Sequence, residues 1–390
     1  MKSIGNLTIR LLRTALNAPC DASLPPDAID EAVLQQIYAF SARHDLAHMA
    51  GDALRRLGLI GADRSADSFK KSQILAAYRC ENILYETELL YQTLEKAGIP
   101  FIPLKGSVIR PFYPSPDMRT SCDIDVLVHP DNLECAIGVL ADELSCTETG
   151  RGSHDVSLLS SRGIHIELHY TLIESDRAPE AVEILDSVWE HVSPEDGFTC
   201  RMRMHDDLFL FYHFVHMMKH FVDGGCGIRT FMDLWVLDHR SPTDMHACDA
   251  MLEKAGLLTF ADACRRLAEV WFSDADPDDT TEAMAQFIYG GGVYGSVDNR
   301  VAVRQTKMGR AKYLMSRIIL PYDSMKYQYP VLKKHRYLLP FCQVHRWTHL
   351  TSKDAAKRAL HELNLTGNLT DEKQKNTVDL FAKLGLDDIN

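Results

Sequence analysis

The chain contains 390 residues, of which 46% are hydrophobic and 25% are charged, with 22 glycines and 16 prolines. These values lie near globular averages and exclude a fibrous or intrinsically disordered protein. There are 42 lysines and arginines against 54 aspartates and glutamates, so the formal net charge is −12. Such a surface repels phosphate backbones, which excludes non-specific wrapping of long nucleic acids.

The amino-terminal region has no secretory or membrane character. Arg10 and Arg13 stand where a signal peptide needs an apolar segment,. No apolar run in the sequence reaches the roughly 18 to 20 residues that cross a bilayer. The cysteines form no CxxC pair and are expected to be reduced thiols. We therefore expect a cytoplasmic protein that has no membrane partner.

The first part of the chain, residues 1–97, has the spacing of helices. Apolar residues recur at intervals of three and four within 28–57, which predicts helical structure there,. A longer helix is expected over 67–96, and Gly98 and Pro100 end it,. We expect this region to be helical throughout.

The middle of the chain has a different texture. Between Pro100 and Tyr170, the short apolar runs PFIPL, DIDVLV, VSLLS and GIHIELHY alternate with turn-forming residues, which predicts strands of one sheet. A helix is expected over 130–144. Helical spacing returns after residue 178 and continues to the end,. The sequence thus predicts an α+β fold, with a sheet-containing core at 98–195 and a helical region at 196–390.

The predicted strand DIDVLV carries two acids close together. Successive side chains of a strand alternate between its faces, so Asp123 and Asp125 share one face while Ile124 and Val126 share the other,. Two neighbouring carboxylates repel each other unless a cation lies between them, and their hard oxygens suit Mg²⁺. This pair predicts a divalent metal site.

A later predicted strand repeats the pattern. In Ile164-His165-Ile166-Glu167-Leu168-His169, the residues His165, Glu167 and His169 share one face,. If this strand lies beside the one that carries Asp123 and Asp125, the three acids can hold two metals about 3.5 to 4 Å apart, as in-line phosphoryl chemistry requires. We expect Asp123, Asp125 and Glu167 to bind metal and to be catalytic.

A third feature is the turn Lys105-Gly106-Ser107, which follows a predicted strand and precedes a predicted helix. Glycine allows close backbone approach, and the amides of a helix N-terminus together with the Ser107 hydroxyl favour phosphate oxygens. Lys105 adds a positive charge for a triphosphate. Alone, Lys-Gly-Ser is a weak signal, and its value comes from the acidic strands that follow.

Taken together, Leu104-Lys105-Gly106, Arg119 ahead of Asp123-Ile124-Asp125, and Glu167-Leu168-His169 resemble the bacterial family of uncharacterised nucleotidyltransferases, within the DNA polymerase β-like nucleotidyltransferase superfamily. The resemblance implies a small mixed sheet that transfers a nucleoside monophosphate from an NTP with Mg²⁺ or Mn²⁺. It assigns metal binding to Asp123, Asp125 and Glu167, and phosphate binding to Gly106 and Ser107. The acceptor stays open among small hydroxylated molecules, peptides and protein side chains.

For several other polar residues the sequence is consistent with two roles. Arg119 either orders the loop before Asp123 or neutralises charge on the phosphates. His169 either orients Glu167 or accepts the proton of the attacking hydroxyl. Arg229 and Asp233 are four residues apart and form either a helix pair or part of the cleft,.

Three histidines, His213, His216 and His220, recur at intervals of three and four in a predicted helix that begins at residue 206,. They could hold zinc, line the cleft with His220 as the main contributor, or form a polar face. The predicted activity is therefore nucleotidyl transfer. The alternatives are a catalytically silent nucleotide-binding regulator and a metal-dependent hydrolase that uses this helix.

Overall fold

The computed structural model describes residues 2–18, 29–61, 64–174, 178–308, 310–349 and 371–387. Residue 28, where the first predicted helical segment begins, lies outside the described residues. Among the described helices, none combines the length and the apolar composition that crossing a membrane requires.

Helices form the N-terminal region, as expected. They are α1 (Lys2–Ala15), α2 (Glu31–Arg43), α3 (Ala47–Arg56) and α4 (Arg64–Lys96). The side chain of Asp30 caps α2 by accepting the Val33 N–H at 2.8 Å,. The predicted segment 28–57 is divided at Asp45, whose φ of 54° ends the helical path between α2 and α3,. Asp45 thereby reaches the wall of the cavity described below.

The sheet lies in the middle of the chain. Its strands are β1 (Phe101–Pro103), β2 (Asp123–Val128), β3 (Thr147–Arg151), β4 (Asp155–Leu159) and β5 (His165–His169), in the order β1-β2-β5-β4-β3. β2 and β5 are parallel, whereas the other pairs are antiparallel. The short helix α5 (Gly106–Ile109) follows β1, and α6 (Leu133–Leu144) follows β2. The prediction of an α+β fold with a small mixed sheet is confirmed.

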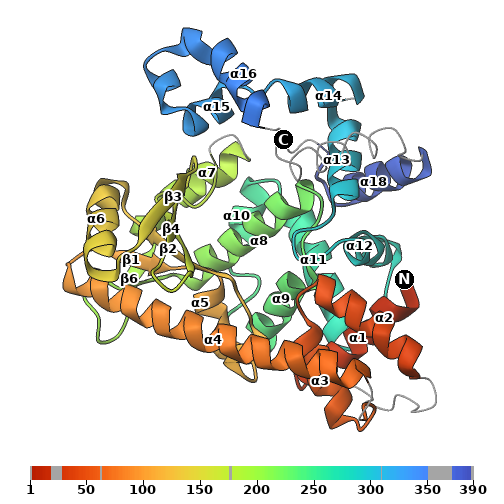
Figure 1. Ribbon diagram of the computed structural model, residues 1–390. Helices are drawn as coiled ribbons and strands as arrows, with labels where there is room; N and C mark the ends of the chain where they lie inside the picture. Colours follow the sequence, from red (N-terminus) through yellow and green to blue (C-terminus); the bar gives the residue numbers. More distant parts are fainter. Residues whose placement is uncertain are drawn as a thin grey trace.

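One face of the sheet is covered by helices. Ile124 and Val126 of β2 and Leu168 of β5 are buried in a hydrophobic core that includes residues of α4 and α6,. Figure 1 shows α4 running along the sheet and on to the N-terminal helices. Because side chains alternate, packing this face on α4 and α6 turns the acids of β2 and β5 to the opposite face.

The described part of the chain after residue 178 is helical apart from a hairpin of β6 (Val192–Pro194) and β7 (Met202–Met204) that the helical spacing did not predict. Its helices are α7 (Pro179–Asp186), α8 (Asp206–Val222), α9 (Ile228–Arg240), α10 (Asp249–Lys254), α11 (Leu258–Phe272), α12 (Asp279–Tyr289), α13 (Val297–Met308), α14 (Arg310–Ile318), α15 (Tyr322–Gln328), α16 (Leu339–His349) and α18 (Asp371–Lys383).

The two helical regions share one hydrophobic core. α1 packs against α11 and α12, and buried residues such as Leu11 and Phe260, which lie far apart in the sequence, belong to the same cluster. The open face of the sheet points toward α8 and α9 of this helical body, as Figure 1 shows. The site therefore forms between the sheet and the helices.

Candidate active site

The pairing of β2 with β5 brings the predicted acids side by side. Asp125 lies directly opposite Glu167 in the parallel register, and Asp123 lies opposite His165. His169 is two residues beyond Glu167 and so shares its face,. This register is set by the buried apolar residues on the other face, because a slip of one residue would turn the carboxylates of one strand into that apolar core,.

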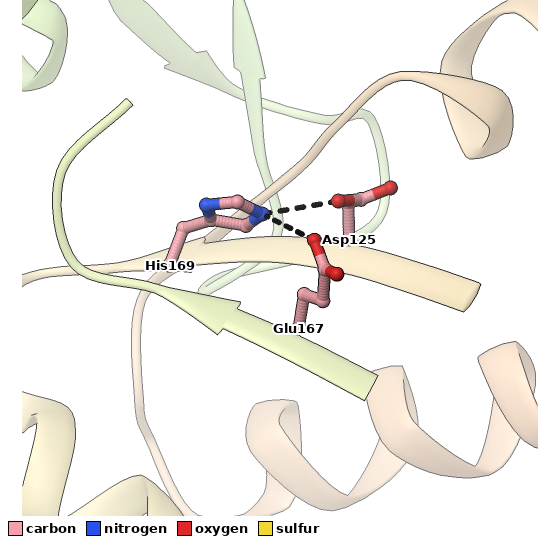
Figure 2. Close-up of side chains that lie close together, drawn as sticks. All are labelled: Asp125, Glu167 and His169. Carbon is pink, nitrogen blue, oxygen red and sulfur yellow. Dashed lines mark hydrogen bonds and ion pairs between the residues drawn. The ribbon is translucent and has the colours of Figure 1, made fainter. Parts of the chain in front are cut away.

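The tightest group in the site consists of Asp125, Glu167 and His169, drawn in Figure 2. His169 Nε2 lies 3.0 Å from Asp125 Oδ1 and 3.5 Å from Glu167 Oε2. One ligand atom from each of the three residues lies within 4.8 Å of the others. Asp123 is outside this group. It lies two residues before Asp125 on β2, on the same face, and lines the same cavity.

Lys105 approaches the acids from the turn between β1 and α5. Its ammonium lies 2.7 Å from Asp125 Oδ1 and 3.9 Å from Glu167 Oε2. The backbone of Lys105 has a φ of 46°, a left-handed conformation that a residue with a side chain rarely adopts,. This strained turn is held by a hydrogen bond from the Leu104 N–H to the carbonyl of Asp125 at 3.1 Å,.

The charges of the site shift the pKa values of its members. Burial and the charges of Asp125 and Glu167 raise the pKa of Asp123 to about 6,. Burial favours the neutral form of Asp125, but the Lys105 charge and the His169 bond hold its pKa well below the ordinary value. The pKa of Lys105 is raised, because the Asp125 charge outweighs burial. The site therefore holds more carboxylate charge than Lys105 neutralises.

These residues line a cavity of about 630 Å³, which is within the usual size of a small-molecule site. Its wall contains most of the residues that the sequence predicted, namely Lys105, Gly106, Arg119, Asp123, Asp125, Glu167, His169 and His220. Ser107 lies beside this wall, half-buried in the first turn of α5. A Cβ on Gly106 would come 3.4 Å from Nη1 of Arg119, an ordinary van der Waals contact, so the turn lies against the arginine without requiring glycine at this position.

Arg119 is held by the helical body. Its Nε and Nη2 donate to the two carboxylate oxygens of Asp233 on α9, each at 2.9 Å, and the Tyr113 hydroxyl donates to the same carboxylate at 2.6 Å. Nη1 of Arg119 donates to the carbonyl of Thr120 at 3.1 Å. These contacts order the loop before β2, which is one of the two roles predicted for Arg119.

Arg229 and Asp233 each pair with a residue on another element. The Nη2 of Arg229 donates to Asp45 Oδ2 at 2.8 Å and to the Thr120 hydroxyl at 2.9 Å. The helix pair that their spacing suggested is therefore replaced by two long-range pairs. Together they tie α9 to the loop before β2 and to the break between α2 and α3.

Of the three histidines of α8, two line the cavity and one does not. His216 and His220 line the cavity, with 3.2 Å between their Nε2 atoms, whereas His213 is 7% exposed and lies outside the cavity wall. Across the described chain, no group of three metal-ligating side chains includes any of them. The predicted alternative of a three-histidine metal site is thus not assembled by α8. His213 and His220 share a face of the helix but lie seven residues, about 10 Å, apart along its axis,.

Several residues of the cavity were not predicted. Tyr212 and Lys219 lie on α8 with His216 and His220, and Lys219 bonds to Glu174 at 2.7 Å. The signal was present, since positions 212, 216, 219 and 220 follow helical spacing along one face,. No local pattern points to Glu174 or to Asp45.

The fold and site define a nucleotidyltransferase-type arrangement, in which a small mixed sheet presents carboxylates to a cavity beside the strained turn at Lys105. The chain matches the family model described as uncharacterised nucleotidyltransferase over residues 30–273, and it belongs to this family. Searches of curated proteins and of solved structures gave no match. The matched residues include β2, β5, α8 and α9, and so most of the cavity wall.

Proposed function

We propose that this protein transfers a nucleoside monophosphate from an NTP to a hydroxyl of a small-molecule, peptide or protein acceptor, with release of pyrophosphate. One observation supports this most strongly. Asp125 and Glu167 face each other on adjacent parallel strands, with Asp123 on the same face, at the wall of a cavity of about 630 Å³. Family membership supports nucleotidyl transfer in general.

The residues fit a divalent cation. Asp125 and Glu167 offer oxygen atoms that converge within 4.8 Å. The raised pKa of Asp123 reflects its burial and the neighbouring carboxylate charges, both of which a bound cation offsets,. Oxygen donors suit Mg²⁺ or Mn²⁺. In the proposal Asp123, Asp125 and Glu167 hold the ion. When bound, Mg²⁺ or Mn²⁺ stabilises the charge of the leaving pyrophosphate and lowers the pKa of the acceptor hydroxyl.

The other residues bind and orient. Lys105, Gly106 and Ser107 are proposed to bind phosphate oxygens, since Lys105 brings a positive charge to the turn beside the acids,. His169 hydrogen-bonds to Asp125 and fixes the direction of that carboxylate,. Arg119, bonded to Asp233 but present in the cavity wall, adds positive charge where the phosphates lie,.

The remaining cavity wall comes from the helices. Here His220 of α8 is proposed to contact the nucleotide. In the same proposal, residues 98–195 are the transferase core, and the helical regions 1–97 and 196–390 close the cavity around it. Long nucleic acids are not proposed as acceptors, because the net charge of −12 disfavours them,.

The test is incubation of the protein with each labelled NTP, Mg²⁺ or Mn²⁺ and a cell extract, followed by mass spectrometry of molecules that gain a nucleotide. The wild type should add an NMP to a specific acceptor. Asp125→Asn should not, whereas Asp262→Asn, a change at an exposed position on α11, should behave as the wild type. An acceptor labelled equally by Asp125→Asn would refute the proposal.

A second candidate, a catalytically silent nucleotide-binding regulator, is favoured by one observation. The Lys105 ammonium contacts Asp125 at 2.7 Å and Glu167 at 3.9 Å, so the chain itself supplies a cation to the acids. NTP binding in calorimetry, without pyrophosphate release in any extract, would support this candidate. Pyrophosphate release that depends on Asp125 would exclude it.

A further inference from the structure

Aromatic rings form part of the wall of the cavity that also contains the acids. Along α8, the Tyr212 and His216 ring centroids are 6.1 Å apart, and those of His216 and His220 are 4.4 Å apart. The series continues onto the loop after α12, where the Tyr294 ring lies 6.0 Å from that of His220. All four residues line the cavity. The rings run from buried Tyr212 to Tyr294, which is 64% exposed.

The loop that carries Tyr294 is fixed by close backbone contacts. Gly295 has a φ of 71°, and a Cβ there would come within 2.1 Å of the carbonyl oxygen of Gly224. The N–H of Ser296 donates to that carbonyl at 3.1 Å, and the N–H of Val293 donates to the Arg43 carbonyl at 3.2 Å. Only glycine fits such an approach. The loop is therefore held against the end of α8 with an aromatic side chain presented to the cavity.

The two imidazoles of this wall are neutral near pH 7. Burial and the Lys219 charge lower the pKa of His220 to about 4, and burial and the Lys105 charge lower the pKa of His216 well below its ordinary value,. Neutral planar rings stack on other planar rings without the cost of desolvating a charge. The wall thus favours a flat, uncharged aromatic group.

The two ends of the wall differ in burial. The inner end, at Tyr212, is buried beside the Lys105 turn: burial raises the pKa of Tyr212, and the Lys105 and Asp125 charges also act on it. The outer end, at Tyr294, is 64% exposed, and the Asp123 and Glu167 charges reach it too. An NTP can meet both ends of the wall, since its charged triphosphate fits beside Lys105 and its planar base fits against the exposed ring.

We propose that Tyr294, with His220, stacks on the base of the NTP while the triphosphate lies at the Lys105 turn. This inference rests on the proposed function and names the part of the substrate that the aromatic wall binds. Residues 290–296 lie after the stretch 30–273 that matches the family model. The base is therefore held by a loop that the family match does not include.

The test is isothermal titration calorimetry with Mg²⁺ and two kinds of ligand, the four NTPs and inorganic tripolyphosphate, which has no base. Alanine at a base-stacking aromatic costs about 1 to 3 kcal/mol, so Tyr294→Ala should weaken the binding of at least one NTP about fivefold or more. The same variant should bind tripolyphosphate as the wild type does. Tyr294→Phe keeps the ring and should retain NTP affinity. Tyr337→Ala removes a tyrosine on the far C-terminal helices that is 72% exposed, and should change neither affinity.

Failure of the inference is distinguishable from failure of the proposed function. If the wild type binds NTP and Tyr294→Ala binds every NTP equally well, or loses NTP and tripolyphosphate affinity in the same proportion, the stacking role is overturned and the transferase proposal stands. If the wild type binds no NTP at all, both are overturned.

Discussion

Replacing Asp233 by Asn should destabilise the protein by about 3 to 5 kcal/mol, the cost of leaving one partner of a buried ion pair alone. The side chains of Arg119 and Asp233 are only 10% and 1% exposed. Asp233 accepts from Nε and Nη2 of Arg119 at 2.9 Å each and from Tyr113 at 2.6 Å. In Asp233→Asn the guanidinium keeps its charge and its buried position but loses the opposite charge.

The assay is urea denaturation followed by far-UV circular dichroism, with the midpoint and slope measured for each variant. Asp262→Asn is the matched control, because Asp262 pairs with Arg265 at 2.9 Å but is 58% exposed. An exposed pair contributes less than about 1 kcal/mol. The double variant Arg119→Met/Asp233→Leu should lose less free energy of unfolding than Arg119→Met and Asp233→Leu lose in sum, since it leaves no unpaired charge. If Asp233→Asn lowered the free energy of unfolding as little as Asp262→Asn does, the buried pair would not have the predicted effect on stability.

Three further predictions concern two of the acids and Lys105. Asp125→Asn should slow pyrophosphate release at least about 100-fold, because it removes a charge aimed at the reacting groups. Lys105→Met should weaken NTP binding about tenfold in calorimetry, the scale of one charged hydrogen bond. The pKa of Asp123 is about 6 when folded against an ordinary 3.8, so its carboxylate costs stability as pH rises through this interval. Asp123→Asn should therefore raise the free energy of unfolding by about 2 to 3 kcal/mol above pH 6, in EDTA, and less toward pH 4.

Each of these has a contradicting result. Asp125→Asn with wild-type pyrophosphate release would remove that residue from the reaction, and an unchanged NTP affinity in Lys105→Met would remove the lysine from the phosphate site. If Asp123→Asn melted at the wild-type temperature at both pH 4 and pH 7.5, ionisation of Asp123 would not destabilise the folded protein.

The strands and helices around the site were predictable where apolar residues recur at the regular spacing of a strand or a helix. The alternation in β2 and β5 follows from packing one face on α4 and α6, so it is visible in the residues themselves,. By contrast, β3 is exposed along its length and has no apolar positions to alternate, so its sequence reads as a loop. The small hairpin of β6 and β7 is too short to show a period.

Contacts across long sequence separations were not predictable. Arg229 pairs with Asp45, 184 residues away. It does so, and not with Asp233, because the tertiary fold brings α9 to the break between α2 and α3. Likewise Tyr294 reaches the cavity only because glycines at 224 and 295 let two backbones approach. Such pairings depend on tertiary packing, which local spacing does not encode.

In the proposed function, this site moves the α-phosphate of an NTP, with its nucleoside, onto an acceptor. A paired incubation of the wild type and the acceptor-containing extract, with NTP labelled either at the α- or at the γ-phosphate, follows this transfer itself. The α label should enter the acceptor, and the γ label should leave as pyrophosphate. A γ label that enters the acceptor, or that leaves as inorganic phosphate while the α label stays in free nucleotide, would contradict the proposed function.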